Sequence, residues 1–337
     1  SVTASTSTPA HPEAIVHVKQ GNYAQDYKVF IDNVQRATYT TSATDKADLK
    51  TNSIATQLTS QLISNLGSVY TITRNGSAIR IQRTDGNDFT LRTEDSFGNA
   101  ALIGSKGSVQ RFSDLPRRAF NGSKMKVVGD ETSEADNYYV EYEAGDTAEG
   151  VWKESIAEGA DSTLNAATMP WKLVRNANGT FTFSPNDWIS RSVGDAISAS
   201  DPSFVGKKLN DIFFHRNRLG VIADENVIFS RSGRYFSFYP ETVTTVLDTD
   251  PIDVAVSHTK VSILRHAIPF NETLLLFSDQ TQFMLNAGDS LTPATVSINQ
   301  TTEYESSLQA EPVGAGEYVY FATNREGFTG VREFFVQ

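Results

Sequence analysis

The sequence predicts a mainly β protein, in which an incomplete β-propeller-like body carries a small inserted α+β module with one helix on an antiparallel sheet. Three observations lead to this class. Strand, turn, strand patterns rich in aromatic residues recur from about residue 113 onward, and only one segment shows convincing helical periodicity. In addition, 39% of the 337 residues are hydrophobic, which is enough for two or three cores. A β-sandwich is the alternative for the region of repeated strands.

The N-terminal segment, residues 1–13, is rich in Ser, Thr and Pro and predicts a flexible leader. It has neither the basic nor the apolar region of a signal peptide. No window of the chain approaches about eighteen consecutive apolar residues, so no membrane anchor is expected. The chain lacks an initiator methionine and stops at VREFFVQ, within an apolar strand pattern. We therefore expect an internal fragment whose pairing strands are missing at both ends.

Residues 14–112 are expected to form the inserted α+β module. Alternation of apolar and polar residues predicts two or three strands between residues 14 and 41. Further on, VYTITRNGSAIRIQRTDGNDFTLRTE reads as strand, Asn-Gly turn, strand, turn and strand. In the first of these regions, one strand face is expected to carry Tyr27, Val29 and Ile31.

A helix is predicted between these two groups of strands. Asp45 is its expected N-cap, with Asp48 three residues later, and Gly67 lies just past its expected end. Apolar residues at helical spacing should form its buried stripe: Ala47, Ile54, Leu58, Leu62 and Leu66. The module is therefore expected to pack this helix on an antiparallel sheet.

Residues 113–337 are expected to form the propeller-like region, incomplete at both ends. Its theme of aromatic or aliphatic strand, polar turn and strand recurs four times. From Leu219 to Leu274 is 55 residues, and from Leu275 to Tyr320 is 45. These spacings are close to the period of about 50 residues that is typical of four-stranded propeller blades.

The net charge of −11 is concentrated in one segment. Residues 129–161 hold eleven acidic side chains against Lys153 alone, and a solvated loop face is favoured there over a cation-binding site. The segment just before it is basic. Six cations are the candidates for facing DNA or a partner: Lys106, Arg111, Arg117, Arg118, Lys124 and Lys126.

No motif for catalysis or cofactor binding is present. The chain has no cysteine, no Walker A sequence, no G-x-S-x-G and no H-E-x-x-H, so neither an enzyme nor a cofactor is expected. The segment DTDPID gathers Asp248, Asp250 and Asp253, whose oxygens are ligands that calcium accepts. Capping of the turn by these aspartates is favoured over a cation site.

Residues 213–240 alternate aromatic rings with arginines, as a groove for single-stranded nucleic acid would. If residues 212–222 and 226–239 are strands, rings and cations do not collect on one continuous platform. We expect Phe213, Phe229 and Phe236 to be core residues. Four arginines are expected to brace blades or subunits through bidentate bonds to carboxylates: Arg216, Arg218, Arg231 and Arg234.

Several strings in the chain resemble the family of tail tubular protein B, also called the tail nozzle protein, of short-tailed bacteriophages. The resemblance is dense from about Ser113 to Gln337 and looser over residues 14–112. At His215 the family often has another aromatic residue, which puts strict burial of this position in question. The strings are SFVGKKLNDIFFHRNRLGVIADENVIFSRSGRYFSFYP, DTDPIDVAVSHTKVSILRHAIPFNETLLLFSDQTQFMLN, LTPATVSINQTTEYE, PVGAGEYVYFATNREGFTGVREFF, GSKMKVVGDETSEADNYYVEYE and MPWKLVRNANGTFTF.

The resemblance implies a structural protein of the virion tail. It implies a homohexamer of the full-length protein that forms a tube with a central channel for DNA ejection. The partners it implies are tail tubular protein A, which is the adaptor, tail fibre protein, and genomic DNA in transit. It supplies no catalytic residues.

Two other functions remain open from the residues alone. One is a host-polysaccharide-binding or hydrolysing tail protein, because rings such as Trp152, Tyr235, Phe236 and Tyr239 could stack on sugars and carboxylates are abundant. The other is direct DNA binding by the basic segment between Lys106 and Lys126.

Overall fold

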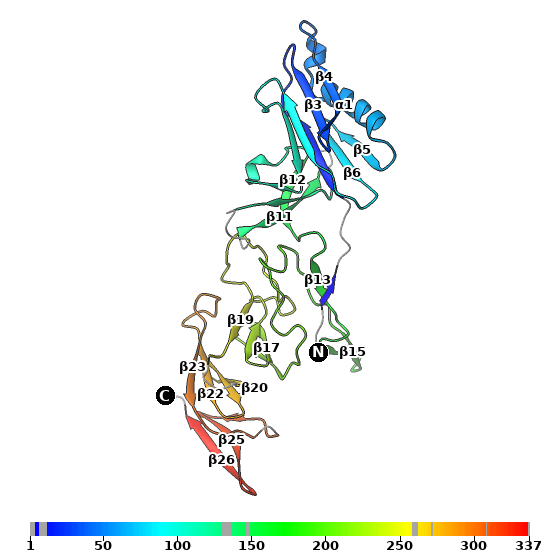
Figure 1. The fold of residues 1–337 in the computed structure, drawn as a ribbon. Helices are drawn as coiled ribbons and strands as arrows, with labels where there is room; N and C mark the ends of the chain where they lie inside the picture. Colours follow the sequence, from blue (N-terminus) through cyan, green and yellow to red (C-terminus); the bar gives the residue numbers. More distant parts are fainter. Residues whose placement is uncertain are drawn as a thin grey trace. The chain divides into compact units, whose positions relative to one another are not determined.

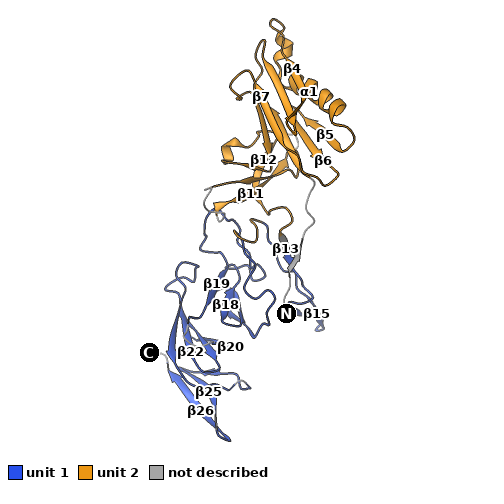
Figure 2. Cartoon of the chain, viewed as in Figure 1, with its two compact units in different colours: residues 1–6, 161–192, 199–337 blue, residues 7–160, 193–198 orange. Residues whose placement is uncertain are grey.

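Strands dominate the computed structural model, which describes residues 4–6, 12–129, 136–145, 149–257, 262–270, 272–307 and 309–335. The one α-helix of these ranges is α1 (Thr51–Leu66), and no helix in them is long and apolar enough to cross a membrane (Figure 1). The mainly β class is therefore confirmed. The chain forms two compact units (Figure 2): unit 1 contains residues 1–6, 161–192 and 199–337, and unit 2 contains residues 7–160 and 193–198.

An eight-stranded sheet forms the frame of unit 2. Its neighbours are antiparallel except for β9 and β10, which pair in parallel. In spatial order its strands are β12 (Gly150–Ser155), β11 (Tyr138–Ala144), β10 (Lys124–Val127), β9 (Ser108–Val109), β8 (Leu102–Lys106), β2 (Glu13–Val18), β6 (Ala78–Arg83) and β5 (Tyr70–Asn75).

This sheet continues across residue 112, where the sequence suggested that the α+β module ends. Ser108 and Val109 lie opposite Lys126 and Val127, so the sheet extends without interruption into the strands that follow. The short 3₁₀ helix η2 (Phe112–Asp114) lies in the connection between them. The compact unit accordingly runs to residue 160, because hydrogen bonding and not sequence composition determines where a sheet ends.

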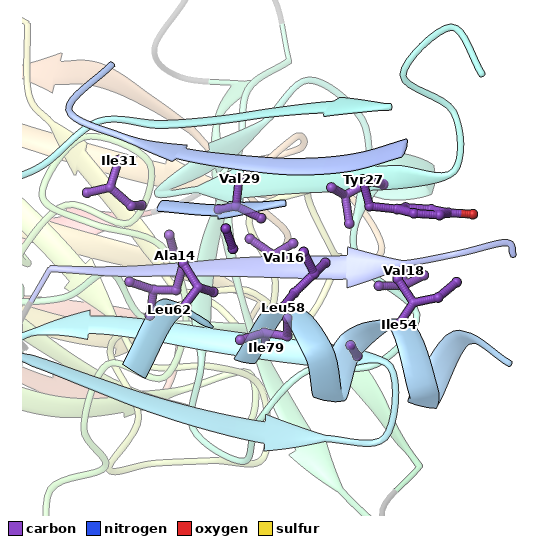
Figure 3. Close-up of a cluster of buried hydrophobic side chains, with 14 of the residues drawn as sticks. Ala14, Val16, Val18, Tyr27, Val29, Ile31, Ile54, Leu58, Leu62 and Ile79 are labelled. Carbon is purple, nitrogen blue, oxygen red and sulfur yellow. The ribbon is translucent and has the colours of Figure 1, made fainter. Parts of the chain in front are cut away.

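A three-stranded sheet completes unit 2, and α1 contacts both this sheet and the eight-stranded one. The strands of the three-stranded sheet, in order, are β4 (Val34–Thr40), β3 (Asp26–Ile31) and β7 (Leu91–Asp95). Along β3, Tyr27, Val29 and Ile31 are buried, which confirms the predicted alternation. Figure 3 shows these side chains close to helix residues such as Leu58 in one apolar cluster.

The helix begins later than its N-cap signal predicts. Asp45 does cap a helix, and its side chain accepts a hydrogen bond from Ala47 N, but this helix is the short 3₁₀ element η1 (Lys46–Leu49). Lys50 is extended, with φ −65° and ψ 126°, so α1 starts anew after it. Ala47 consequently lies outside the buried stripe, and the stripe residues that are buried as predicted are Ile54, Leu58, Leu62 and Leu66.

Unit 1 contains three sheets in succession, each a meander of strands that follow one another in the chain. The first is β16 (Asp211–His215), β17 (Arg218–Ala223), β18 (Asn226–Phe229) and β19 (Ile252–Ala255). The second is β20 (Leu264–Phe270), β21 (Thr273–Ser278), β22 (Gln282–Asn286) and β23 (Ser297–Thr302). The third is β24 (Val313–Ala315), β25 (Tyr318–Arg325) and β26 (Phe328–Phe335).

Consecutive sheets share apolar cores. The second strands of the three meanders begin 55 and 45 residues apart, at Arg218, Thr273 and Tyr318. On β21, Leu274 and Leu276 belong to a cluster with the first sheet, whereas Leu275 and Phe277 belong to a cluster with the third. The middle sheet is thus covered on both faces, which is consistent with an incomplete propeller-like β body.

Two small sheets lie elsewhere in unit 1. One pairs β1 (Ala4–Thr6) with β13 (Asp161–Leu164), and the other pairs β14 (Trp171–Arg175) with β15 (Phe181–Pro185). Part of the expected flexible leader is therefore a strand, because its backbone finds a partner far away in the sequence. The leader's last residue, Glu13, already belongs to β2.

Candidate functional site

The four arginines singled out from the sequence lie on or beside the first meander of unit 1. A continuous strand through residues 212–222 was expected, but the chain turns at Arg216 and Asn217, which have φ values of 43° and 60°. Positive φ at both central residues is the geometry of a tight type I′ hairpin, and asparagine tolerates it well. The turn leaves Arg218 as the first residue of β17, opposite His215.

Arg218 is 1% exposed and donates hydrogen bonds to backbone carbonyl oxygens. Its Nη1 lies 2.8 Å from Ser230 O and 2.6 Å from Asp250 O. Its Nη2 lies 2.7 Å from Asp248 O and 3.1 Å from Leu291 O. Ser230 follows β18, and Leu291 lies between β22 and β23, so one side chain joins parts of the first and second meanders.

The environment of Arg218 differs from the carboxylate pairing expected from the sequence. Burial lowers the pKa of Arg218, and the nearby charge of Asp250 opposes this effect. Arginine keeps its proton in proteins even when its pKa falls, so the buried guanidinium remains charged. Backbone carbonyl oxygens therefore take the place of water as hydrogen-bond acceptors for the Arg218 guanidinium.

Arg216 also contacts the second meander. Its Nη1 lies 2.6 Å from the carbonyl oxygen of Gly288, in the loop after β22. Its Nη2 lies 3.9 Å from a carboxylate oxygen of Glu272, in the turn before β21. Glu272 is exposed, so the first contact is the stronger of the two.

Arg231 and Arg234 lie in the irregular segment after β18. Arg231 forms an ion pair with Glu241 through Nη2, within the same irregular segment. Arg234 donates its backbone N–H to Arg231 O at 3.1 Å, whereas its side chain is exposed. Within the ranges that the structure describes, no carboxylate pairs with the Arg234 guanidinium.

The aromatic residues of this stretch divide between core and surface. Phe213 and Phe229 are buried, as predicted, and their rings meet edge to face at 5.6 Å. The prediction for Phe236 is wrong, because its side chain is 41% exposed and rests edge to face on Trp188. Phe236 follows the end of β18, so the alternation that assigned it to the core does not apply there.

His215 is buried although a polar ring was expected to weaken burial at this position. It is 6% exposed, and its Nε2 has no hydrogen-bond partner in the described part of the chain. Burial, and then the positive charge of Arg216, lower the pKa of His215 to about 4. The folded protein therefore holds this imidazole neutral at pH 7.

Replacing His215 with phenylalanine should make the stability of unit 1 less sensitive to acid. An unfolded histidine binds a proton near pH 6.5, whereas folded His215 does so only near pH 4. Stability is therefore lost as the pH falls through this window, by on the order of 2 kcal/mol. Urea unfolding of the parent and of His215→Phe at pH 7 and pH 4.5 measures how much free energy of unfolding each protein loses on acidification. Equal losses in the two proteins would contradict the prediction.

The side chains of two of the three aspartates in the DTDPID segment, Asp250 and Asp253, make separate backbone contacts. Asp250 accepts a hydrogen bond from Leu247 N at 2.8 Å, and Asp253 accepts one from Ser203 N at 2.7 Å. Asp250 thus caps its own turn, as favoured from the sequence, while Asp253 fixes a distant loop. No group of three acidic or histidine side chains suited to a metal occurs among the described residues.

Three lysines of the basic segment line one pocket of unit 2 with nearby acids. Lys106 Nζ lies 2.8 Å from an Asp88 carboxylate oxygen. Lys124 Nζ donates to Ile156 O at 2.9 Å and lies 3.6 Å from a Glu141 carboxylate oxygen. These two cations are therefore largely compensated within the unit.

The other basic candidates differ in their surroundings. Lys126 Nζ lies 5.9 Å from the centre of the Tyr139 ring, and Arg118 Nη2 lies 2.5 Å from a Glu149 oxygen. The side chain of Arg117 is exposed and has no ion pair among the described residues. Arg111 is also exposed, and its backbone N–H is bound by Asp114. The six cations therefore do not form one free basic face.

An ion pair between a buried arginine and a half-buried aspartate in unit 1 was not predicted from the sequence. Arg191, 2% exposed, places Nη2 2.6 Å from Asp201 Oδ1, and the Tyr239 hydroxyl donates to the same oxygen at 2.8 Å. The guanidinium also lies 5.0 Å from the centre of the Tyr239 ring. Nothing in the spacing of these residues marks them, since they meet through loops without periodicity.

Two rings proposed for sugar stacking are engaged inside the protein. Tyr239 is 2% exposed, and Trp152 donates its indole N–H to Pro116 O at 2.9 Å. Trp152 also packs edge to face on buried Tyr142. Tyr235 remains exposed, but its hydroxyl bonds Asn217 and its ring meets Phe214. Within unit 1, Tyr235 is exposed and Tyr239 is buried, so these two rings do not form one sugar platform.

Comparison with known proteins gives consistent results. The model of the family described as "Bacteriophage nozzle protein" matches residues 1–337. The "Tail tubular protein gp12" of Escherichia phage T7 is 36% identical over 328 residues, which cover 96% of this chain and 41% of that protein. The chain thus spans about two fifths of the length of the curated relative it matches.

Proposed function

Because the chain belongs to the bacteriophage nozzle protein family, we propose that it is a structural part of a phage tail and helps to form the tube through which DNA leaves the virion. The match of the family to residues 1–337 is the observation that carries this proposal. The shared apolar cores between consecutive sheets of unit 1 support this proposal, because the wall of a tube must keep its shape without a bound ligand. No catalytic step is part of the proposed role.

In this proposal the full-length protein assembles as a homohexamer around a channel. Tail tubular protein A, the adaptor, and tail fibre protein are its proposed partners, and genomic DNA is a transient one. The pairing of Lys106 and Lys124 with acidic side chains is compatible with DNA passage. A wall that offers few free cations holds phosphates weakly, so DNA can move along it.

We assign the arginines different proposed roles within this assembly. Arg218 and Arg216 hold the first meander to the second inside one subunit, through carbonyl oxygens of both. Arg231 fixes the irregular segment after β18 through Glu241. Arg234, whose guanidinium is exposed, is the candidate for a contact with a neighbouring subunit or partner.

Electron microscopy of the full-length protein mixed with its adaptor partner tests this function. We expect six-fold rings in which density for unit 1 contributes to the wall. The variant Arg234→Glu, which changes only an exposed charge, should form fewer rings while unfolding at the same temperature as the parent. Particles that remain exclusively monomeric under conditions in which the adaptor itself forms rings would overturn the proposal.

A further inference from the structure

Unit 2 contains a second pocket, of about 460 Å³. It lies among residues of β2, β7 and β8 and the loop at residues 113–117. Its lining includes two cations, Lys19 and Arg117, and the imidazole of His17. Uncharged polar side chains are also present, among them Asn99 and Ser113.

Neither cation of this pocket has an ion-pair partner among the described residues. Lys19 and Arg117 are exposed, and neither forms an ion pair with a described residue. Neighbouring Arg118 differs, because it is bound to Glu149 at 2.5 Å. A pocket wall with two cations that lack internal partners attracts a ligand of opposite charge.

Three cations lie near the imidazole of His17. His17 is 7% exposed, and its pKa is lowered to about 4, first by burial and then by the charges of Lys19, Arg118 and Arg117. Three cations therefore lie close enough to this ring to oppose its protonation. A bound anion would reverse that effect, because it would stabilise the imidazolium form.

The pocket lining contains one carboxylate, that of Asp114. Its Oδ2 accepts the backbone N–H of Arg111 at 3.1 Å, and its Oδ1 lies 3.5 Å from the Ser113 hydroxyl. The loop that carries Asp114 therefore holds its carboxylate in place, and Asp114 offsets one of the two cations of the lining. The charge of the lining, with neutral His17, remains positive.

We propose that this pocket binds a phosphate group of a nucleic acid, with Arg117 and Lys19 as its charged ligands; the choice of a nucleic acid rests on the proposed passage of DNA. The planar guanidinium of arginine suits the paired oxygens of a phosphate, and lysine adds a point charge. Asn99 and Ser113 supply further polar groups around it. Free inorganic phosphate has the same chemistry and is the alternative source.

Nuclear magnetic resonance titration of His17 tests the site directly. With inorganic phosphate, or with a short single-stranded oligothymidylate, the pKa of His17 should rise from about 4. His215, whose pKa is also about 4 but which lies in unit 1, is an internal control and should not move. An unchanged His17 in both titrations would overturn the proposal, and a response to phosphate without one to the oligothymidylate would overturn its nucleic-acid part.

Binding to the intact chain can be measured by calorimetry with the same two probes. Lys19→Ala and Arg117→Ala should each weaken binding about tenfold, the loss of one charge-assisted contact. Asp114→Asn should strengthen binding, because it removes the opposing charge. The matched control is Arg111→Ala, which removes an exposed cation of the same segment outside the pocket lining and should leave affinity unchanged. Equal weakening by Arg111→Ala and Arg117→Ala would indicate diffuse attraction and contradict a defined site.

Discussion

Replacing Arg218 with methionine is expected to lower the free energy of unfolding of unit 1 by about 3 to 5 kcal/mol. Methionine can fill much of the volume of the aliphatic stem but donates no hydrogen bond. The carbonyl oxygens of Ser230, Asp248, Asp250 and Leu291 would then lose a donor, and those that stay buried would lack a replacement. Chemical unfolding followed by circular dichroism and by tryptophan fluorescence, to which Trp171 and Trp188 of unit 1 contribute, measures the loss.

Arg234→Met is the matched control for this experiment. It removes the same type of side chain from the neighbouring segment, but from an exposed position. Its effect should stay within about 0.5 kcal/mol. Similar losses for Arg218→Met and Arg234→Met would mean that the carbonyl contacts of Arg218 do not stabilise the fold.

Truncating Leu58 to alanine should destabilise unit 2 by about 2 to 5 kcal/mol. Leu58 is fully buried, and its cluster includes residues from the helix and from both sheets of the unit, so the cavity would open at their meeting point (Figure 3). Thermal and urea unfolding of the intact chain would show the effect as a lower midpoint for unit 2.

Ile63→Ala provides the comparison on the same helix. Ile63 is 58% exposed, so its truncation removes little buried surface and should cost well under 1 kcal/mol. If the two substitutions changed the midpoint by the same amount, the helix would not be held by the apolar stripe that contains Leu58.

The features that depend on local pattern were predictable from the sequence. The buried stripe of α1 from Ile54 to Leu66 and the buried face of β3 follow from periodicity, and both are confirmed. The family resemblance, drawn from strings such as SFVGKKLNDIFFHRNRLG, is also confirmed by the family match. Such strings preserve the order of core and turn residues even where a fold is difficult to derive from physics alone.

Other features depend on contacts between distant parts of the chain. The parallel pairing of β9 with β10 and the pairing of β1 with β13 have no signature in either strand. The turn at Arg216 and Asn217 lacks glycine, so the strand pattern appeared continuous there. Arg218 finds carbonyl oxygens and not carboxylates, because loops from two meanders bring their backbones to it. Residue type alone could not indicate whether Arg218 binds carbonyl oxygens or carboxylates.

The two-sided burial of β21 has a consequence for how the protein forms. Leu274 and Leu276 contact the preceding sheet and Leu275 and Phe277 the following one, so the middle sheet lacks its final packing until both neighbours are present. Stability in such a stack arises largely at the interfaces between neighbours, as in repeat proteins. A ribosome delivers these sheets in the order in which they stack. The nascent chain can therefore add each new sheet to a surface that is already folded.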